Sequence, residues 1–381
     1  MTFRIDEVLH RRVRRWTARY STLWFNVSGN PPLSLRSYSR QEQRDREERI
    51  DRLRRKARHR GKIRHVIAFI AQEMPGMHTA HVRQFLETCG RTGEKFVARA
   101  RAFDPDLSDA DIQQALRNLW VFNSIQCFLG KPVSLSPSSF AYSLLYPYTD
   151  NSLDRAGESE AEKQALLRWL STQLRGHVAP PDGPRRGRIA ALLGMIRKEH
   201  PPTRRSSVQQ SLLAIHRAQT SARRLHGAIS KPTEHVLVPL TIEKGGTSVL
   251  VDGFLADRLN DREAETIFGY GVLLQLIDDL QDLQEDVDRG DSTPFTRAVR
   301  HGTLEGITNR LFNLVGIVAG KLRDLEDPRE GHVSGLVERS CTTLIQEAVA
   351  RHAHLYRKGY LTMINSRTPV RLTYLRSLAA R

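Results

Sequence analysis

The acidic residues between Asp278 and Asp286 have the types and spacing of a metal site. Five acids fall within nine residues of LLQLIDDLQDLQEDVDRGDSTPFT (273–296), directly behind an apolar run. On a helix, Asp278, Asp282 and Asp286 are spaced i, i+4, i+8 and share a face with Glu285. Exposed like charges in such a row repel by roughly 0.2–0.5 kcal/mol per pair, and the helix dipole disfavours negative charge at a C-terminal end. Helix stability alone therefore does not explain this cluster.

A hard divalent cation would relieve the repulsion within this row. Mg²⁺ prefers a few carboxylates together with substrate phosphates and water molecules. The alternative is an ordinary solvated helix end whose acids pair with arginines elsewhere. The spacing favours a metal site, and with it a bound phosphate.

A second acidic pair follows the aromatic stretch FAYSLLYPYT. Asp150 and Asp154 are spaced i, i+4, and Tyr146 and Tyr142 lie one and two turns before them on the same face. Pro147 is expected to kink or start the helix there. Two such pairs, each ending an apolar helix, can face each other across the core of a helical bundle.

The elements that position these acids are predicted to be helices. No hairpin signal, sustained alternation or internal repeat occurs. The segment VAPPDGPRRG (178–187) is interpreted as a long surface loop inside one domain. We therefore predict an all-α domain over 61–381 and a basic helical extension over 1–60. Apolar residues recur every three to four positions in 79–100, 108–129, 161–175, 203–228, 261–288, 303–326 and 333–361.

The composition is that of a globular chain with a substantial core. The 381 residues are 39% hydrophobic and 27% charged, and no apolar run approaches the roughly 20 residues of a membrane span. The N-terminus lacks the apolar region of a secretory signal. Three widely spaced cysteines, Cys89, Cys127 and Cys341, show no metal-ligand spacing. These features favour a cytoplasmic location.

Most of the net charge of +17 lies near the N-terminus. Residues 1–65 hold 19 Lys and Arg against 7 Asp and Glu. A solvated, ion-paired helix, peripheral contact with an anionic membrane and nucleic-acid binding all remain open. Nucleic acid is disfavoured because no aromatic residue interrupts the arginines of 40–64. Trp16, Trp24 and Phe25 are costly to expose, so part of this segment is expected to dock into the core.

The motif QLIDDLQDLQEDVDRGD resembles the second aspartate-rich motif of the class I isoprenoid synthases. Asp278, Asp282 and Asp286 match its ligand positions, and Asp150 and Asp154 match a first motif of the DxxxD type. With KGGTSVLVDGFLAD (244–257), the chain is most similar to the bacterial large terpene synthases, also called class IB.

The resemblance implies an all-α bundle with a central active-site cavity and a Mg²⁺-dependent terpene synthase activity. Such an enzyme would ionise a long linear prenyl diphosphate with three Mg²⁺ ions and convert the carbocation to a terpene, releasing pyrophosphate. Asp150, Asp154, Asp278, Asp282 and Asp286 would hold the metal.

The resemblance also implies a diphosphate site and a pocket. The pair Gly245–Gly246 would break a helix near the diphosphate. His216 and Gln219 share a predicted helix, where a packed or solvated histidine is favoured over a catalytic one. The expected diphosphate-binding residues are Arg223, Arg224, Lys231, Lys244, Arg289, Arg357 and Tyr356. The expected pocket residues are Tyr142, Tyr146, Gln275, Gly245 and Gly246.

Two departures from the motifs of related enzymes bear on which function the sequence predicts. Only Arg155 follows the first motif, where chain-elongating synthases have an arginine pair. Asp278 and Asp282 stand where the standard cyclase triad has Asn and Ser, so a head-to-head or chain-elongating prenyltransferase is an alternative. Outside the enzymes, the alternative is a basic helical protein that binds RNA or membranes. A small-molecule prenyl diphosphate is the expected partner, and a homodimer is compatible with the sequence.

Overall fold

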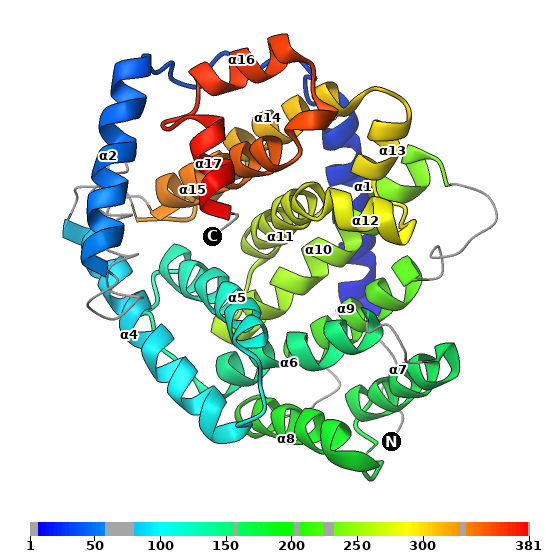
Figure 1. Cartoon of the computed structure of the whole chain (residues 1–381). Coiled ribbons are helices and arrows are strands. Elements are labelled where there is room, and N and C mark those ends of the chain that lie inside the picture. The colour runs from blue at the N-terminus through cyan, green and yellow to red at the C-terminus, as the bar shows by residue number, and fades with distance from the viewer. Residues whose placement is uncertain are drawn as a thin grey trace.

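The computed structural model describes residues 7–57, 80–154, 159–177, 179–201, 206–223, 232–327 and 333–379. These residues form helices and no strands (Figure 1), so the all-α prediction is confirmed. The first half of the chain forms α1 (Glu7–Asn26), α2 (Arg40–Ala57), α4 (Ala80–Phe103), α5 (Asp109–Phe128), α6 (Pro137–Asp154), α7 (Glu160–Leu174), α8 (Gly183–Glu199) and α9 (Ser207–Arg223). The second half forms α10 (Glu234–Ala256), α11 (Asp261–Gln281), α12 (Leu283–Arg289), α13 (Pro294–Arg300), α14 (Leu304–Arg323), α15 (Val333–Arg351), η1 (Ala353–Leu355), α16 (Lys358–Ser366) and α17 (Leu372–Ala379).

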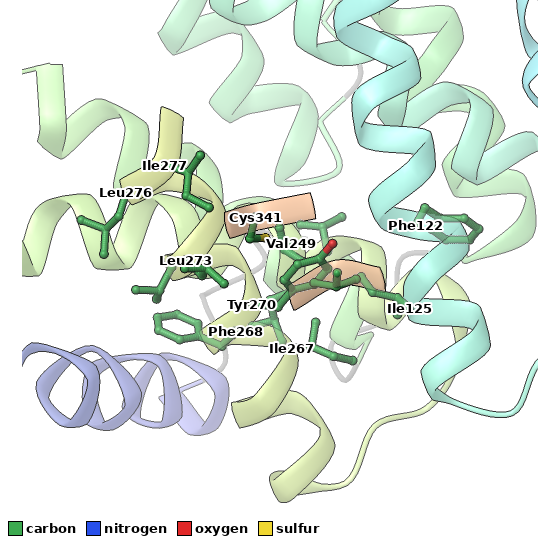
Figure 2. Close-up of a cluster of buried hydrophobic side chains, with 14 of the residues drawn as sticks. Phe122, Ile125, Val249, Ile267, Phe268, Tyr270, Leu273, Leu276, Ile277 and Cys341 are labelled. Carbon is green, nitrogen blue, oxygen red and sulfur yellow. The ribbon is translucent and has the colours of Figure 1, made fainter. Parts of the chain in front are cut away.

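Helices α10 and α11 form the centre of the bundle (Figure 1). They pack along each other, while α1, α5 and α9 contact α10 and α14 and α15 contact α11. Both helices are apolar on most sides, which is the pattern of a helix surrounded by other helices. Figure 2 shows the result around α11, where Ile267, Phe268, Leu273 and Leu276 are fully or almost fully buried.

Glycines allow α10 and α11 to approach closely. A methyl group at Gly245 would lie 2.6 Å from the carbonyl oxygen of Gly271, and one at Gly271 would lie 2.9 Å from Val249 Cβ. Helix α10 is continuous through Gly245 and Gly246, so the predicted helix break is wrong. The two glycines remove side chains at a helix contact instead of supplying a bend.

The N-terminal helix α1 belongs to the same core. Trp16 and Trp24 are 0% and 1% exposed, and Trp16 packs against Phe268 of α11 with ring centroids 5.7 Å apart. The predicted docking of these aromatics is confirmed. The expected boundary near residue 60 falls in 58–79, outside the described residues.

The arginines of α1 make ion pairs with α11. Arg12 and Arg15 each contact Asp261, at 2.7 Å and 2.6 Å, and Arg19 contacts Glu265 at 2.7 Å. Asp261 lies in the first turn of α11, where negative charge is favoured by the helix dipole. The arginines on this side of α1 are therefore paired with acids at the start of the central helix.

Helix α2 packs at the edge of the bundle near α15 and α17 (Figure 1). The buried Glu47 accepts hydrogen bonds from the backbone N–H and the guanidinium of Arg371, which precedes α17. Tyr374 of α17 donates to Asp51 at 2.8 Å. The basic helix is thus joined to the C-terminal end of the chain through its acidic residues.

Several predicted helix boundaries differ from the structure. The loop assigned to 178–187 ends at Asp182, because Pro184 in the first turn of α8 has the backbone angle that a helix start requires. The helix assigned to 261–288 is divided at Asp282 into α11 and α12. The helix assigned to 333–361 ends at Arg351, and η1 and the start of α16 follow. Among the residues described, no helix combines the length and apolar character needed to cross a membrane.

Candidate active site

The acidic row lies where α11 passes into α12. Asp282 separates the two helices with backbone angles of φ −90° and ψ 8°. The N–H of Asp282 still donates to the carbonyl of Asp278, and that of Asp286 to the carbonyl of Asp282, both at 2.9 Å. The helical spacing therefore continues through the junction, and the three carboxylates follow one another at intervals of one turn.

The row is electrostatically unfavourable in the protein alone. Burial, together with the charges of Asp278, Glu285 and Asp286, raises the pKa of Asp282 to about 6. Burial also raises the pKa of Asp286 against the opposing effect of Arg289. This is the expected effect of neighbouring carboxylates that are partly removed from water.

Asp279 is a further member of this acidic cluster that sequence reasoning did not assign to the site. It is 8% exposed, and its Oδ1 accepts a hydrogen bond from Gln275 at 2.8 Å. Its Oδ2 is buried and has no hydrogen-bond partner among the described residues. Burial raises its pKa to about 7, although Lys244 opposes this. Burying a carboxylate oxygen without a hydrogen bond costs folding free energy. In the sequence, the position of Asp279 directly after Asp278 was the signal that could have assigned it to the site.

Three cationic side chains act on this cluster. Lys244 of α10 lowers the pKa of both Asp279 and Asp286, and Arg117 of α5 lowers that of Asp282. Arg289 donates to Asp286 at 2.6 Å and to Asp291 at 2.9 Å. Lys244 and Arg289 were predicted for the diphosphate, whereas Arg117 was not, because only the fold brings α5 to this junction.

The donor set fits a hard cation such as Mg²⁺. All the clustered acidic side chains offer carboxylate oxygens, the ligand type that Mg²⁺ prefers, and the Oδ2 of Asp279 is an acceptor without a hydrogen-bond partner among the described residues. Within the described part of the chain, no three Asp, Glu, His or Cys side chains converge closely enough to hold one ion by themselves. Mg²⁺ commonly binds through one or two carboxylates plus water and phosphate oxygens, and this arrangement suits that mode.

A small apolar cavity of about 50 Å³ lies between α6, α7, α8 and α9. Two of the predicted pocket residues, Tyr142 and Tyr146, form part of its wall as an edge-to-face pair with centroids 5.6 Å apart. The other lining residues are Leu145, Thr149, Leu170, Leu174, Leu193, Leu212, Ile215, His216 and Gln219.

Helix α10 connects the cavity to the acidic cluster. Tyr142 donates to the carbonyl of Ser248 at 2.8 Å, and Tyr146 is hydrogen-bonded to the Ser248 hydroxyl. Ser248 lies four residues after Lys244, about one helical turn or 5–6 Å along α10. Lys244, which acts on the acids, and Ser248, which contacts the tyrosines, are therefore neighbours one turn apart on α10.

Gln275 and the paired glycines lie in the contact between α10 and α11. A methyl group at Gly245 would overlap the Gln275 side chain, and one at Gly246 would overlap the Phe268 ring. Gln275 itself holds Asp279. These three predicted pocket residues therefore support the acidic cluster, and they do not line the cavity of about 50 Å³.

Of the other predicted residues on α6, on α9 and after α9, the structure describes the side chain of Arg223. Arg223 ends α9, one turn after Gln219, and lies 3.6 Å from Glu160 of α7. The side chains of Asp150 and Asp154 lie outside the described residues, as do Arg224 and Lys231. Their assignment stays a prediction.

Tyr356 and Arg357 contact α14 in the described structure. The Tyr356 ring stacks on Tyr360 at 5.3 Å, and its hydroxyl lies 2.9 Å from that of Thr308. Arg357 is exposed, and its backbone N–H donates to Glu305 at 3.0 Å. This pair is therefore engaged with a different helix from those that form the acidic junction.

Thr149, His216 and Gln219 are polar cavity residues that sequence reasoning did not place in the pocket. Packing was the favoured interpretation for His216, and it is indeed buried, with 9% of its surface exposed. Its position on the cavity wall follows from the packing of α9 against α6 and α7, which helical periodicity does not reveal.

The chain is similar in structure to a solved protein. The linalool/nerolidol synthase from Streptomyces clavuligerus, solved with 2-fluorogeranyl diphosphate, matches with a TM-score of 0.43 and 15% sequence identity. The match covers 70% of this chain and 98% of that one. No protein-family model and no curated protein sequence matches the chain. A similarity of this degree does not determine the activity of the chain.

Proposed function

We propose that this protein is a Mg²⁺-dependent class I terpene synthase. It would ionise a linear prenyl diphosphate and convert the resulting carbocation to a terpene with release of pyrophosphate. The observation that supports this most strongly is that one helix, α10, serves both parts: Lys244 acts on the carboxylate cluster, and Ser248, one turn later, contacts the tyrosines of an apolar cavity.

The acidic junction is the proposed diphosphate end. Asp278, Asp282 and Asp286, with Asp150 and Asp154 from α6, would hold the ions. When bound, Mg²⁺ would offset the negative charge that grows on the leaving diphosphate. Ionisation of an allylic diphosphate needs no nucleophile, so stabilisation of that charge is the main requirement.

The protein's own cations would share this task. Lys244 and Arg289 already act on the carboxylates, and in the proposed complex they would contact diphosphate oxygens. Arg223, Arg224 and Lys231 are proposed to add to this positive charge. Because guanidinium and ammonium groups bind phosphate oxygens through charge-assisted hydrogen bonds, each would hold the diphosphate against the ions.

The cavity between α6 and α9 is the proposed prenyl end. Its leucines exclude water, which would otherwise quench a carbocation, and the faces of Tyr142 and Tyr146 can stabilise positive charge. The volume of about 50 Å³ is below the roughly 300–1,000 Å³ of typical small-molecule sites. We therefore expect α7 and α8, which supply Leu170, Leu174 and Leu193, to move outward when a prenyl chain binds.

The test is incubation of the protein with linear C10 to C35 prenyl diphosphates. Pyrophosphate release and hydrocarbon products are measured with Mg²⁺ and with EDTA, and products are identified by mass spectrometry. We expect release that requires Mg²⁺ and a single prenyl diphosphate. If no diphosphate in this series is consumed, the proposal is wrong and a binding function becomes the better hypothesis.

A prenyltransferase is the second candidate because the acidic row contains only carboxylates. Asp278 and Asp282 occupy positions at which the standard cyclase triad has Asn and Ser. A condensing enzyme joins two substrate molecules, so its product contains more carbons than either. Products larger than the supplied substrate, or a requirement for added isopentenyl diphosphate, would favour this candidate.

A further inference from the structure

His216 is a buried imidazole on the wall of the apolar cavity. It lies on α9 among Leu212, Ile215 and the tyrosines of α6. Its Nδ1 is buried and has no hydrogen-bond partner among the described residues. Burying a polar nitrogen without a hydrogen bond costs folding free energy. We therefore looked for a role of His216 in the chemistry of the cavity.

The other polar groups of the cavity wall are already engaged. The Tyr142 hydroxyl donates a hydrogen bond to the carbonyl of Ser248, and the Tyr146 hydroxyl is hydrogen-bonded to the Ser248 hydroxyl. Thr149 Oγ1 donates to the carbonyl of Leu145 at 2.9 Å. Gln219 also takes part in an interaction of its own. Among the described cavity-lining groups, His216 is the one with a buried side-chain polar atom, its Nδ1, that has no hydrogen-bond partner.

The imidazole is kept neutral by its surroundings. Burial, and to a lesser extent the charge of Arg175, lowers the pKa of His216 to about 4. A neutral imidazole has one nitrogen lone pair that can accept a proton. It is therefore ready as a base throughout the physiological pH range.

We propose that His216 is the base that terminates the carbocation, an inference that rests on the proposed terpene synthase function. In this step an imidazole nitrogen takes a proton from the carbon next to the cationic centre. The C–H electron pair becomes the second bond of a C=C double bond, so the cation becomes a neutral alkene and His216 becomes an imidazolium. No other reactant is needed.

The same environment explains how the base is restored. An imidazolium in this apolar cavity, near Arg175, is unstable relative to the neutral ring. It therefore gives its proton to water or to the released pyrophosphate once the cavity opens. The low basicity is no obstacle, because a carbocation with an adjacent C–H bond is a far stronger acid than an imidazolium.

The experiment measures alkene formed per pyrophosphate released in the parent, His216→Phe and His216→Gln. Phe keeps a planar ring of similar shape without a base, and Gln keeps a polar group without basicity. We expect the ratio for the principal alkene to fall by roughly tenfold or more in both variants, by analogy with the loss of a general base. Alcohols and alkene isomers should replace the principal alkene. The exposed His177→Gln is the matched control and should leave the ratio unchanged.

The outcomes separate this inference from the proposed function. An unchanged ratio in either folded variant, even with slower pyrophosphate release, would show that His216 only packs or binds and would overturn the inference alone. If Phe at this position unfolds the protein, shown by its melting curve, the Gln variant decides. Absence of pyrophosphate release by the parent would overturn the proposed function and this inference with it.

Discussion

The charged residues at the end of α11 oppose one another more than they stabilise the fold. Asp282 is flanked by Asp278, Glu285 and Asp286, all of which raise its pKa. Asp279 is buried with an unsatisfied oxygen. Proteins keep such unfavourable groups where they serve a site, which is why we expect removal of one charge to separate stability from activity.

Asp282→Asn is expected to lower activity and raise stability. One ligand charge is lost from the middle of the row, so pyrophosphate release should fall on the order of 10²-fold. In EDTA, which removes metal ions, an ionised Asp282 lowers the free energy of unfolding of the parent. The reason is that its pKa is about 6 in the folded protein and about 3.9 in an unfolded chain. Near pH 4 the two proteins should differ by only about 0.5 kcal/mol, because Asp282 is protonated in the folded parent and about half ionised in the unfolded chain.

As the pH rises from about 4 to 6, the unfolded parent releases its proton first, so the parent loses stability that the Asn variant keeps. The full shift corresponds to about 3 kcal/mol, and solvent screening of this partly exposed carboxylate reduces the expected difference to on the order of 1–2 kcal/mol above about pH 7. Urea unfolding at pH 4, 6 and 8 measures it. Asp288→Asn, at an exposed carboxylate paired with Gln284, is the control and should stay within about 0.5 kcal/mol. If Asp282→Asn is less stable than the parent but its folded fraction keeps full specific activity, Asp282 is a structural ion-pair residue.

At the scale of elements, the distance between α10 and α11 depends on glycines. Gly245, Gly246 and Gly271 have no room for a methyl group, because backbone or ring atoms of the facing helix occupy that space. The same contact holds Lys244 next to the acids and Gln275 next to Asp279. A shift between these helices would therefore move the cations relative to the carboxylates.

Gly271→Ala is expected to destabilise the protein. The new Cβ would lie 2.9 Å from Val249 Cβ and closer still to the backbone of Gly245, and overpacking of this kind costs about 1–3 kcal/mol. Gly316→Ala in α14 is the matched control, since a methyl there meets no atom within 4 Å. That variant should gain about 0.5–1 kcal/mol from helix propensity. Denaturant unfolding of both variants tests the contact, and equal effects at the two positions would contradict it.

At the scale of the whole molecule, the N-terminal part completes the bundle. Helix α1 covers α10 and α11 with Trp16, Tyr20 and Trp24, and α2 joins the C-terminal end through Glu47 and Arg371. Much of the basic character in α1 is used in ion pairs with α11. These described contacts support the ion-paired interpretation of the N-terminal charge for α1.

Trp16→Ala is expected to lower the free energy of unfolding by about 3–5 kcal/mol, because the side chain is fully buried against Phe268. The charge control is the double variant Arg12→Gln, Arg15→Gln. It removes two exposed ion pairs to Asp261 and should cost about 0–1 kcal/mol per pair. Thermal and urea unfolding compare the two. A larger loss in the arginine variant would mean that charge, and not burial, attaches α1.

The sequence by itself determined the helical class, the acidic row and the docking of the tryptophans. Each depends on local information: helical periodicity over 108–129, the spacing of Asp278, Asp282 and Asp286, and the cost of exposing Trp16. Only the tertiary structure decided that Gly245 and Gly246 serve close packing, that Arg117 and Asp279 join the acids, and that His216 lines a cavity. These features depend on which faces of distant helices meet, and burial by another helix is not encoded in the spacing of either helix alone.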